Sequence, residues 1–88
     1  MITVTVVYAL PGEATVREVR LTEGATVRDA IAASGIEDEF PEQRGRWAAV
    51  GIFARPVSLD RIVRDGDRVD LYRALSADPK ELRRRRVR

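Results

Sequence analysis

The stretch that decides the fold is LDRIVRDGDRVDLYRAL, residues Leu59 to Leu75 of an 88-residue chain. Residues 59–63 have the composition of a short apolar crossover, and residues 65–67 form an Asp-Gly-Asp bend typical of tight turns. Residues 68–72 then alternate polar and apolar side chains, which predicts a strand with Val69 and Leu71 facing the core. In so short a chain, we expect this turn and strand to complete the sheet.

The start of the chain predicts a β-hairpin. Residues 2–8 alternate apolar and polar side chains at period two, and residues 15–21 resume an extended pattern after a turn at Pro11-Gly12. The side chains expected to face the core are Ile2, Val4, Val6, Tyr8, Val19 and Leu21.

A single helix is predicted after the break at residues 23–25. Thr26 precedes Asp29 by three residues, which is the spacing of a capping box, and Gly35 can end the helix in a left-handed conformation. The residues that recur at helical spacing form a narrow, mostly apolar stripe: Val27, Ala30, Ile31 and Ser34.

The middle of the chain predicts a loop and then a strand. Residues 37–47 contain a proline, a glycine and many charges, which predicts a long exposed loop. Residues 49–53 predict a third strand, with Val50 and Ile52 inward and a stop at Pro56. The order is then ββαββ, a mixed sheet whose first and last strands lie parallel at the centre and whose helix covers one face. The uncovered face would present Thr3, Thr5, Val7, Arg68, Asp70 and Tyr72.

Composition removes most of the parts that catalysis uses. The chain has no Cys, which excludes disulfides, thiolate nucleophiles and cysteine-ligated metals, and no His, which excludes the usual near-neutral base. Ser34, Ser58 and Ser76 therefore have no His or Cys partner that would make a nucleophile. No cofactor and no small-molecule substrate are expected. With no basic leader and no long apolar span, no transmembrane segment is predicted, and a cytoplasmic location is expected.

Charge is distributed unevenly. Residues 80–88 hold six basic side chains and one acidic one, whereas the rest of the chain has ten basic and thirteen acidic side chains. Any binding to a polyanion is therefore expected at the C-terminal end.

Several segments, taken together, resemble the bacterial RnfH family, small ubiquitin-like β-grasp proteins that include one also called RatB. The resemblance covers nearly the whole chain. The matching segments are residues 6–11, residues 23–27 with 32–35, residues 51–56, residues 65–69, and Tyr72-Arg73 with residues 77–81.

This resemblance implies a non-catalytic protein without an established active site. It implies a gene that lies beside Rnf electron-transport genes in some bacteria and beside a RatA-like gene in others. Sulfur carriers and ubiquitins share the β-grasp fold but need a Gly-Gly terminus, whose carboxylate an activating enzyme adenylates. None of the six glycines here adjoins another, so carrier chemistry is not expected.

The C-terminal segment allows two interpretations. Asp78, Pro79 and Glu81 stand where a helix start would need an N-cap, N1 and N3 residue, and a basic stretch follows. So short a helix is marginal alone, so one interpretation is a frayed, solvated terminus. The other is an arginine-rich contact to RNA, to the ribosome or to an acidic protein.

The loop at 37–47 raises two further possibilities. Glu37, Asp38 and Glu39 are consecutive and lack the spaced oxygens of a calcium loop, so a solvated acidic segment is favoured over a metal site. Phe40 and Trp47 are either exposed anchors for a partner or side chains folded over the edge of the core, and the second is favoured.

The sequence thus predicts an α+β, ubiquitin-like β-grasp domain at residues 1–77, with four to five strands and one main helix, and a basic tail at residues 78–88. The expected function is binding of another protein, with an Rnf-type electron-transport complex as one setting; the alternative is an RNA- or ribosome-associated module. The candidate partner-binding residues are Arg68, Asp70, Tyr72, Lys80, Arg83, Arg84, Arg85 and Arg86.

Overall fold

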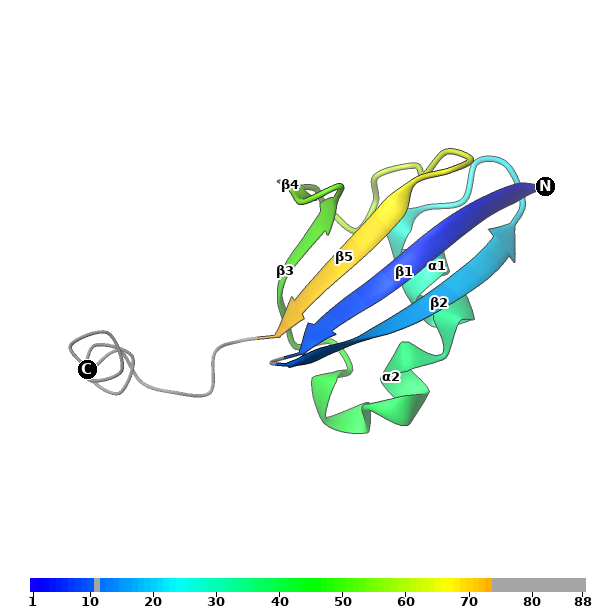
Figure 1. Cartoon of the computed structure of the whole chain (residues 1–88). Coiled ribbons are helices and arrows are strands. Elements are labelled where there is room, and N and C mark those ends of the chain that lie inside the picture. Colours follow the sequence, from blue (N-terminus) through cyan, green and yellow to red (C-terminus); the bar gives the residue numbers. More distant parts are fainter. Residues whose placement is uncertain (11, 74–88) are drawn as a thin grey trace, which may run out of the picture.

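The computed structural model describes residues 1–10 and 12–73, and these form one sheet with helices on one side (Figure 1). The elements in chain order are β1 (Ile2–Leu10), β2 (Glu13–Leu21), α1 (Val27–Ser34), α2 (Ile36–Glu39), the 3-10 helix η1 (Pro41–Gln43), β3 (Trp47–Ile52), β4 (Arg55–Pro56) and β5 (Arg68–Arg73). The boundary predicted between residues 77 and 78 lies outside the described residues.

The sheet has the strand order β2-β1-β5-β3-β4. β1 and β5 run parallel at its centre, whereas β2 pairs with β1, β3 with β5 and β4 with β3 in antiparallel fashion. The parallel central pair and the helical crossover between the two hairpins confirm the predicted ubiquitin-like β-grasp architecture.

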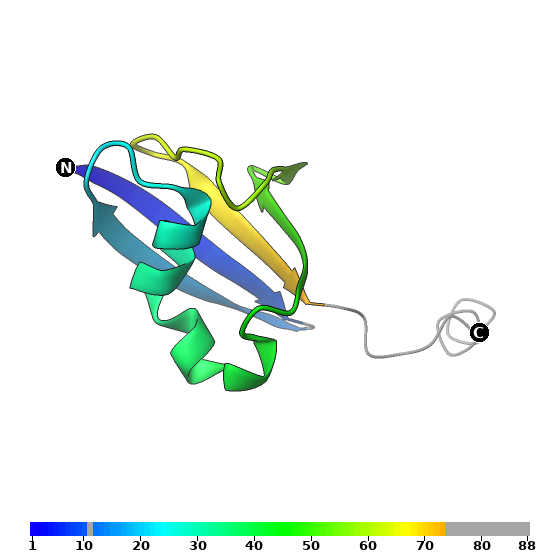
Figure 2. The ribbon, with the colours of Figure 1, turned by 180° about the vertical axis from the view of Figure 1, so that it is seen from behind.

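The core lies between the sheet and α1. Figure 2 shows α1 crossing one face of the sheet, with α2 following it at the edge. Alternate side chains of β1 and β5 are buried on this face. Every side chain predicted for the inward face of the first hairpin and of β5 is buried. The core consists of Ile2, Val4, Val6, Tyr8, Val19, Leu21, Val27, Ala30, Ile31, Ile36, Ile52, Val63, Val69 and Leu71.

Helix α1 begins and ends where its sequence predicts. The Thr26 hydroxyl accepts a hydrogen bond from Asp29 N, and the Asp29 carboxylate accepts one from Thr26 N, so both halves of the capping box are present. Gly35 ends the helix at φ 73°, a conformation that costs a residue without Cβ very little. Ser34 is buried but satisfied, because its hydroxyl donates to Ile31 O and accepts from Ile36 N.

The segment predicted as an exposed loop over residues 37–47 is mostly exposed, but the prediction that it is irregular is wrong. The segment begins with α2 and continues through η1. Its start is anchored because Ile36 is fully buried, and its end is fixed because Trp47 Nε1 donates a hydrogen bond to Glu37 Oε2 at 2.9 Å. Charge and proline content indicated a surface segment correctly, but they did not reveal the contacts with distant residues that order it, such as the packing of Phe40 against Tyr8.

Two details of the second half also differ from the prediction. Pro56 does not simply end the third strand, because Arg55 and Pro56 turn back and pair with β3 as the short strand β4. Ile62 is 55% exposed, whereas Val63 is buried. Ile62 forms an isolated β-bridge with Thr26, and in extended backbone adjacent side chains point in opposite directions, so only Val63 reaches the core.

None of the helices formed by residues 1–10 and 12–73 is long and apolar enough to cross a membrane.

Candidate partner-binding surface

The face of the sheet opposite the helices is uncovered by any described element and faces the reader in Figure 1. We call it the open face. Alternation along the strands assigns to it Thr3, Thr5, Val7 and Ala9 of β1, Ala14, Val16, Glu18 and Arg20 of β2, Ala49 and Gly51 of β3, and Arg68, Asp70 and Tyr72 of β5.

Apolar side chains gather along the middle of the open face. Val16 is 54% exposed and lies opposite Val7 in the β1–β2 register, and Tyr72 is 37% exposed and lies opposite Ala49 in the β3–β5 register. Large apolar side chains on an uncovered sheet face are typical of an interaction surface. Tyr72 is therefore placed where the sequence predicts it.

The β3–β4 turn adds an aromatic side chain to this surface. Phe53 and Ala54 are the two turn residues, and both have positive φ angles, 49° and 67°, a conformation that non-glycine residues rarely adopt. Phe53 is 54% exposed. Gly51 makes the tight return possible, because a Cβ on it would lie 2.8 Å from the Arg55 carbonyl oxygen.

Asp70 and Arg68 fix this turn from the neighbouring strand. The Asp70 carboxylate accepts hydrogen bonds from Ala54 N at 2.7 Å and from Arg68 Nη2 at 3.2 Å, and it forms an ion pair with Arg68 Nε at 2.8 Å. The Arg68 guanidinium in turn lies over the Phe53 ring, 5.3 Å from its centroid, in cation–π geometry. Asp70 is only 5% exposed. Asp70, a predicted partner-binding residue, is thus mostly buried and positions Arg68 and the turn from beneath, and its direct contact with a partner stays a prediction.

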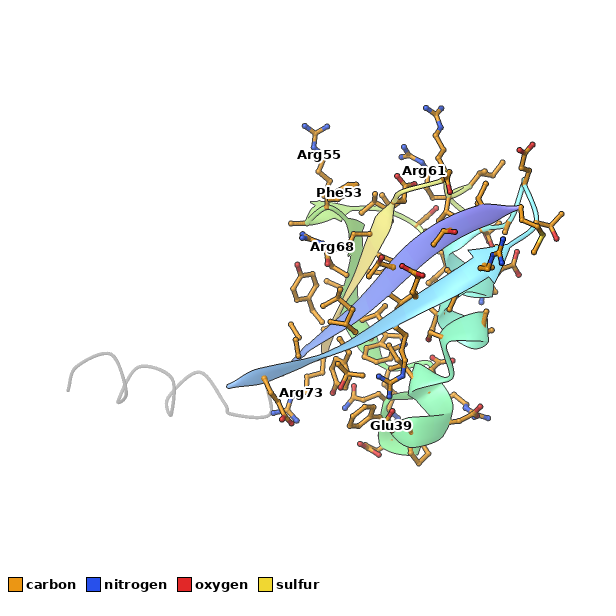
Figure 3. The ribbon with its side chains drawn as sticks, turned by 45° about the vertical axis from the view of Figure 1, so that its right-hand side comes forward. Glu39, Phe53, Arg55, Arg61, Arg68 and Arg73 are labelled. Atoms are coloured by element: carbon orange, nitrogen blue, oxygen red, sulfur yellow. The ribbon has the colours of Figure 1, made fainter. Side chains whose placement is uncertain are left out.

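Two further arginines lie at the same end of the molecule. Figure 3 shows Arg55 and Arg61 beside Phe53 and Arg68, at the opposite end from Glu39. Arg55, Arg61 and Phe53 line one shallow groove with Ile52, Pro56 and Val57. We call Phe53, Arg55, Arg61 and Arg68 the arginine-rich end. Phe53, Arg55 and Arg61 are not among the residues predicted from the sequence.

The opposite end of the molecule is acidic and internally paired. Glu39 of α2 forms an ion pair with Arg17 of β2, and Asp38 forms one with Arg44. Asp38 and Glu39 are exposed, as predicted for a solvated acidic run, whereas Glu37 is half-buried and accepts hydrogen bonds from Gly45 N and Trp47 Nε1. Within residues 1–10 and 12–73, no group of three or more acidic, His or Cys side chains could hold a metal ion.

Phe40 and Trp47 are packed against the core edge. Both rings meet Tyr8 edge-on, each with a centroid separation of 4.9 Å. Both are partly buried, so the interpretation favoured from the sequence is confirmed. Trp47 also borders a groove between α1 and β3, whose lining includes Ile31, Val50 and Leu59.

The remaining candidates lie beyond the described part of the chain. They are Lys80, Arg83, Arg84, Arg85 and Arg86. Their role in partner binding stays a prediction.

A model of the family described as "RnfH family Ubiquitin" matches residues 2–86 of the chain. The chain belongs to the RnfH family. Curated relatives agree with this: it is 51% identical to Protein RnfH of Cronobacter sakazakii over 86 residues, 98% of this chain and 90% of the relative. It is 49% identical to Protein RnfH of Halorhodospira halophila over 82 residues, 93% and 84% of the two chains. It is also 51% identical to a UPF0125 protein of Vibrio cholerae over 87 residues, 99% and 86% of the two chains.

Solved structures similar to this RnfH-family chain confirm the β-grasp fold. One is a putative molybdopterin converting factor subunit 1 from Pyrococcus furiosus, with a TM-score of 0.60, 24% identity, and coverage of 85% of this chain and 100% of that one. Another is small archaeal modifier protein 1 of Haloferax volcanii, with a TM-score of 0.63, 15% identity and the same coverage. At these identities the likeness concerns the fold alone.

Proposed function

We propose that this RnfH-family protein is a non-catalytic module that binds another protein through the open face of its sheet. The observation that supports this most is the exposure of Val16 and Tyr72 on the open face, and of Phe53 in contact with Arg68 of that face. Burial of such side chains against a partner is favourable, and aromatic residues contribute most to interface energies.

The available chemistry favours binding over catalysis. The chain has neither His nor Cys, and in the described residues no polar side-chain atom is buried without a hydrogen-bond partner. A surface of valine, tyrosine, phenylalanine and arginine suits recognition, because it combines apolar area with cations that hydrogen-bond in fixed geometry. The protein would act in the cytoplasm, and an Rnf-type electron-transport complex is one setting in which such a module would serve.

A second candidate function is association with RNA or the ribosome. It is supported by the sequence of residues 80–88, with six basic side chains in nine residues. Arginines bind phosphates in forked geometry, and such binding weakens steeply with salt.

Affinity capture from native bacterial cells distinguishes these functions. Three N-terminally tagged full-length forms are compared: the unaltered protein, Val16→Asp, and a form with Arg83, Arg84, Arg85 and Arg86 replaced by Ser. A discrete protein retained by the unaltered and tail-altered forms, but lost from Val16→Asp, is the expected result. Recovery of RNA that depends on the tail arginines and falls with salt would support the second function instead.

A further inference from the structure

We propose that the arginine-rich end binds an acidic segment of the partner protein, in which an apolar side chain is flanked by carboxylates. This inference rests on the proposed function, and it adds the location and the chemistry of the contact. It uses three observations: the conformation of the β3–β4 turn, the charge of the neighbouring side chains, and the groove beside them.

The turn holds an aromatic ring in solvent at a position that does not favour one. Two-residue hairpin turns with positive φ at both positions favour Asn-Gly, because these residues tolerate the left-handed region. Here Phe53 and Ala54 occupy the two positions, and the Phe53 ring gains no burial in the core. Unfavourable backbone conformations of this kind concentrate at functional sites, where the surrounding structure holds them in place.

The surrounding structure does hold the turn rigidly. Asp70 accepts from Ala54 N, and the Arg68 guanidinium is held between the Asp70 carboxylate and the Phe53 ring. One face of the ring is thus covered by a cation. A ring fixed in this way offers its remaining surface to an apolar side chain with little loss of conformational entropy on binding.

The charges beside the ring determine the kind of partner. Arg68 is neutralised by Asp70, whereas Arg55 and Arg61 form no ion pair within the described part of the chain. The nearby carboxylates of Asp65 and Asp67 accept hydrogen bonds from the backbone N–H groups of Thr3 and Arg64.

Arg55 and Arg61 line a single groove together with Phe53. Two cations that form no ion pair in the described residues, beside an exposed ring, complement carboxylates beside an apolar residue.

The same observations favour a protein segment over RNA. Binding of single-stranded RNA uses a continuous basic track and aromatic rings whose faces are free for base stacking. This end offers two arginines without partners and one ring, and Arg68 already covers one face of that ring.

Fluorescence anisotropy with a defined peptide tests the inference. The probe is a fluorescein-labelled peptide with Leu-Phe at its centre and Asp or Glu at all flanking positions. All proteins are full-length and have Arg83, Arg84, Arg85 and Arg86 replaced by Ser, so the tail cannot bind the probe. Arg55→Glu combined with Arg61→Glu should weaken binding at least about tenfold, since two attractive charges become repulsive. Phe53→Asn, which suits the turn conformation, should weaken it about threefold or more.

The matched control is Arg46→Glu combined with Arg73→Glu, which makes the same change of charge at the opposite end of the molecule, where Trp47 pairs with Arg73, and should alter affinity less than about twofold. A peptide with Asn and Gln in place of the acids, and one with Gly-Gly at the centre, should both bind more weakly. The inference is overturned if the two double variants lose affinity equally, or if the uncharged peptide binds as tightly as the acidic one. It is also overturned if the parent protein does not bind the acidic peptide, or if an oligouridylate binds more tightly than this peptide through Arg55 and Arg61. If a captured partner still depends on Val16 in any of these cases, the proposed function stands and only this inference fails.

Discussion

The Asp70 carboxylate accepts a hydrogen bond from the Ala54 backbone N–H at 2.7 Å and thereby joins the central strand β5 to the β3–β4 turn. It also neutralises Arg68, so one buried acid holds both the backbone and the cation of the arginine-rich end. Removing the Asp70 carboxylate should leave the Ala54 N–H group without an acceptor and the Arg68 guanidinium without its ion-pair partner. Asp70→Ala is expected to lower the free energy of unfolding by about 2–3 kcal/mol, measured by urea denaturation.

Asp70→Asn is the matched variant. Its amide oxygen can still accept from Ala54 N, so only the charge on Arg68 loses its partner, and the expected loss is about 1 kcal/mol. Equal and negligible losses in the two variants would show that Asp70 does not fix the turn.

Ala54→Gly should make the protein more stable. Ala54 has φ 67°, where a Cβ is disfavoured, and Gly removes that cost at the expense of some unfolded-state entropy. The expected gain is about 0.5–1 kcal/mol in the free energy of unfolding. Ala32→Gly, at an exposed position within helix α1, should have the opposite sign, with a loss of about 0.5–1 kcal/mol. A loss from both substitutions would contradict the left-handed assignment of Ala54.

Gly51→Ala should destabilise the β3–β4 hairpin. The added Cβ would lie 2.8 Å from the Arg55 carbonyl oxygen, which is backbone and cannot move aside without opening the turn. We expect a loss of about 2 kcal/mol. Ala49→Ser, on the same strand and exposed, should change stability by less than about 0.5 kcal/mol. Thermal or urea unfolding that shows Gly51→Ala as neutral would mean that the hairpin is less tight than described.

Replacing Phe40 with alanine should lower the stability of the protein much more than replacing Phe53. Phe40 packs edge-on against Tyr8 and is partly buried, so Phe40→Ala is expected to cost about 2 kcal/mol of stability. Phe53 is mostly exposed and contacts Arg68, so Phe53→Ala should cost less than about 1 kcal/mol. A larger loss at Phe53 than at Phe40 would contradict the assignment of Phe53 to binding and Phe40 to packing.

The sequence predicted the elements whose signals are local. Alternation at period two identified the inward side chains of β1 and β5, and Thr26, Asp29 and Gly35 marked the ends of α1. Each of these signals lies within a few residues, so no tertiary information was needed.

The sequence did not predict the features that depend on contacts between distant segments. The β3–β4 turn contains Phe53-Ala54 rather than Asn-Gly, and its conformation is held by Asp70, sixteen residues away. Arg61 likewise joins Arg55 in one groove only through the path of the segment that connects β4 to β5. Arg68, Asp70 and Tyr72 were assigned to the open face correctly, but the burial of Asp70 beneath the turn followed from the same distant contact.

The most direct test of binding through the open face is site-specific photocross-linking in native cells. A benzoylphenylalanine is placed in the full-length protein at Val16 or Tyr72 of the open face, or at the exposed Ala33 of helix α1 as control. Cross-links to one discrete protein from positions 16 and 72, but not from position 33, are the predicted result. Cross-links from position 33 alone, or from none of the three, would contradict a docking surface on the open face.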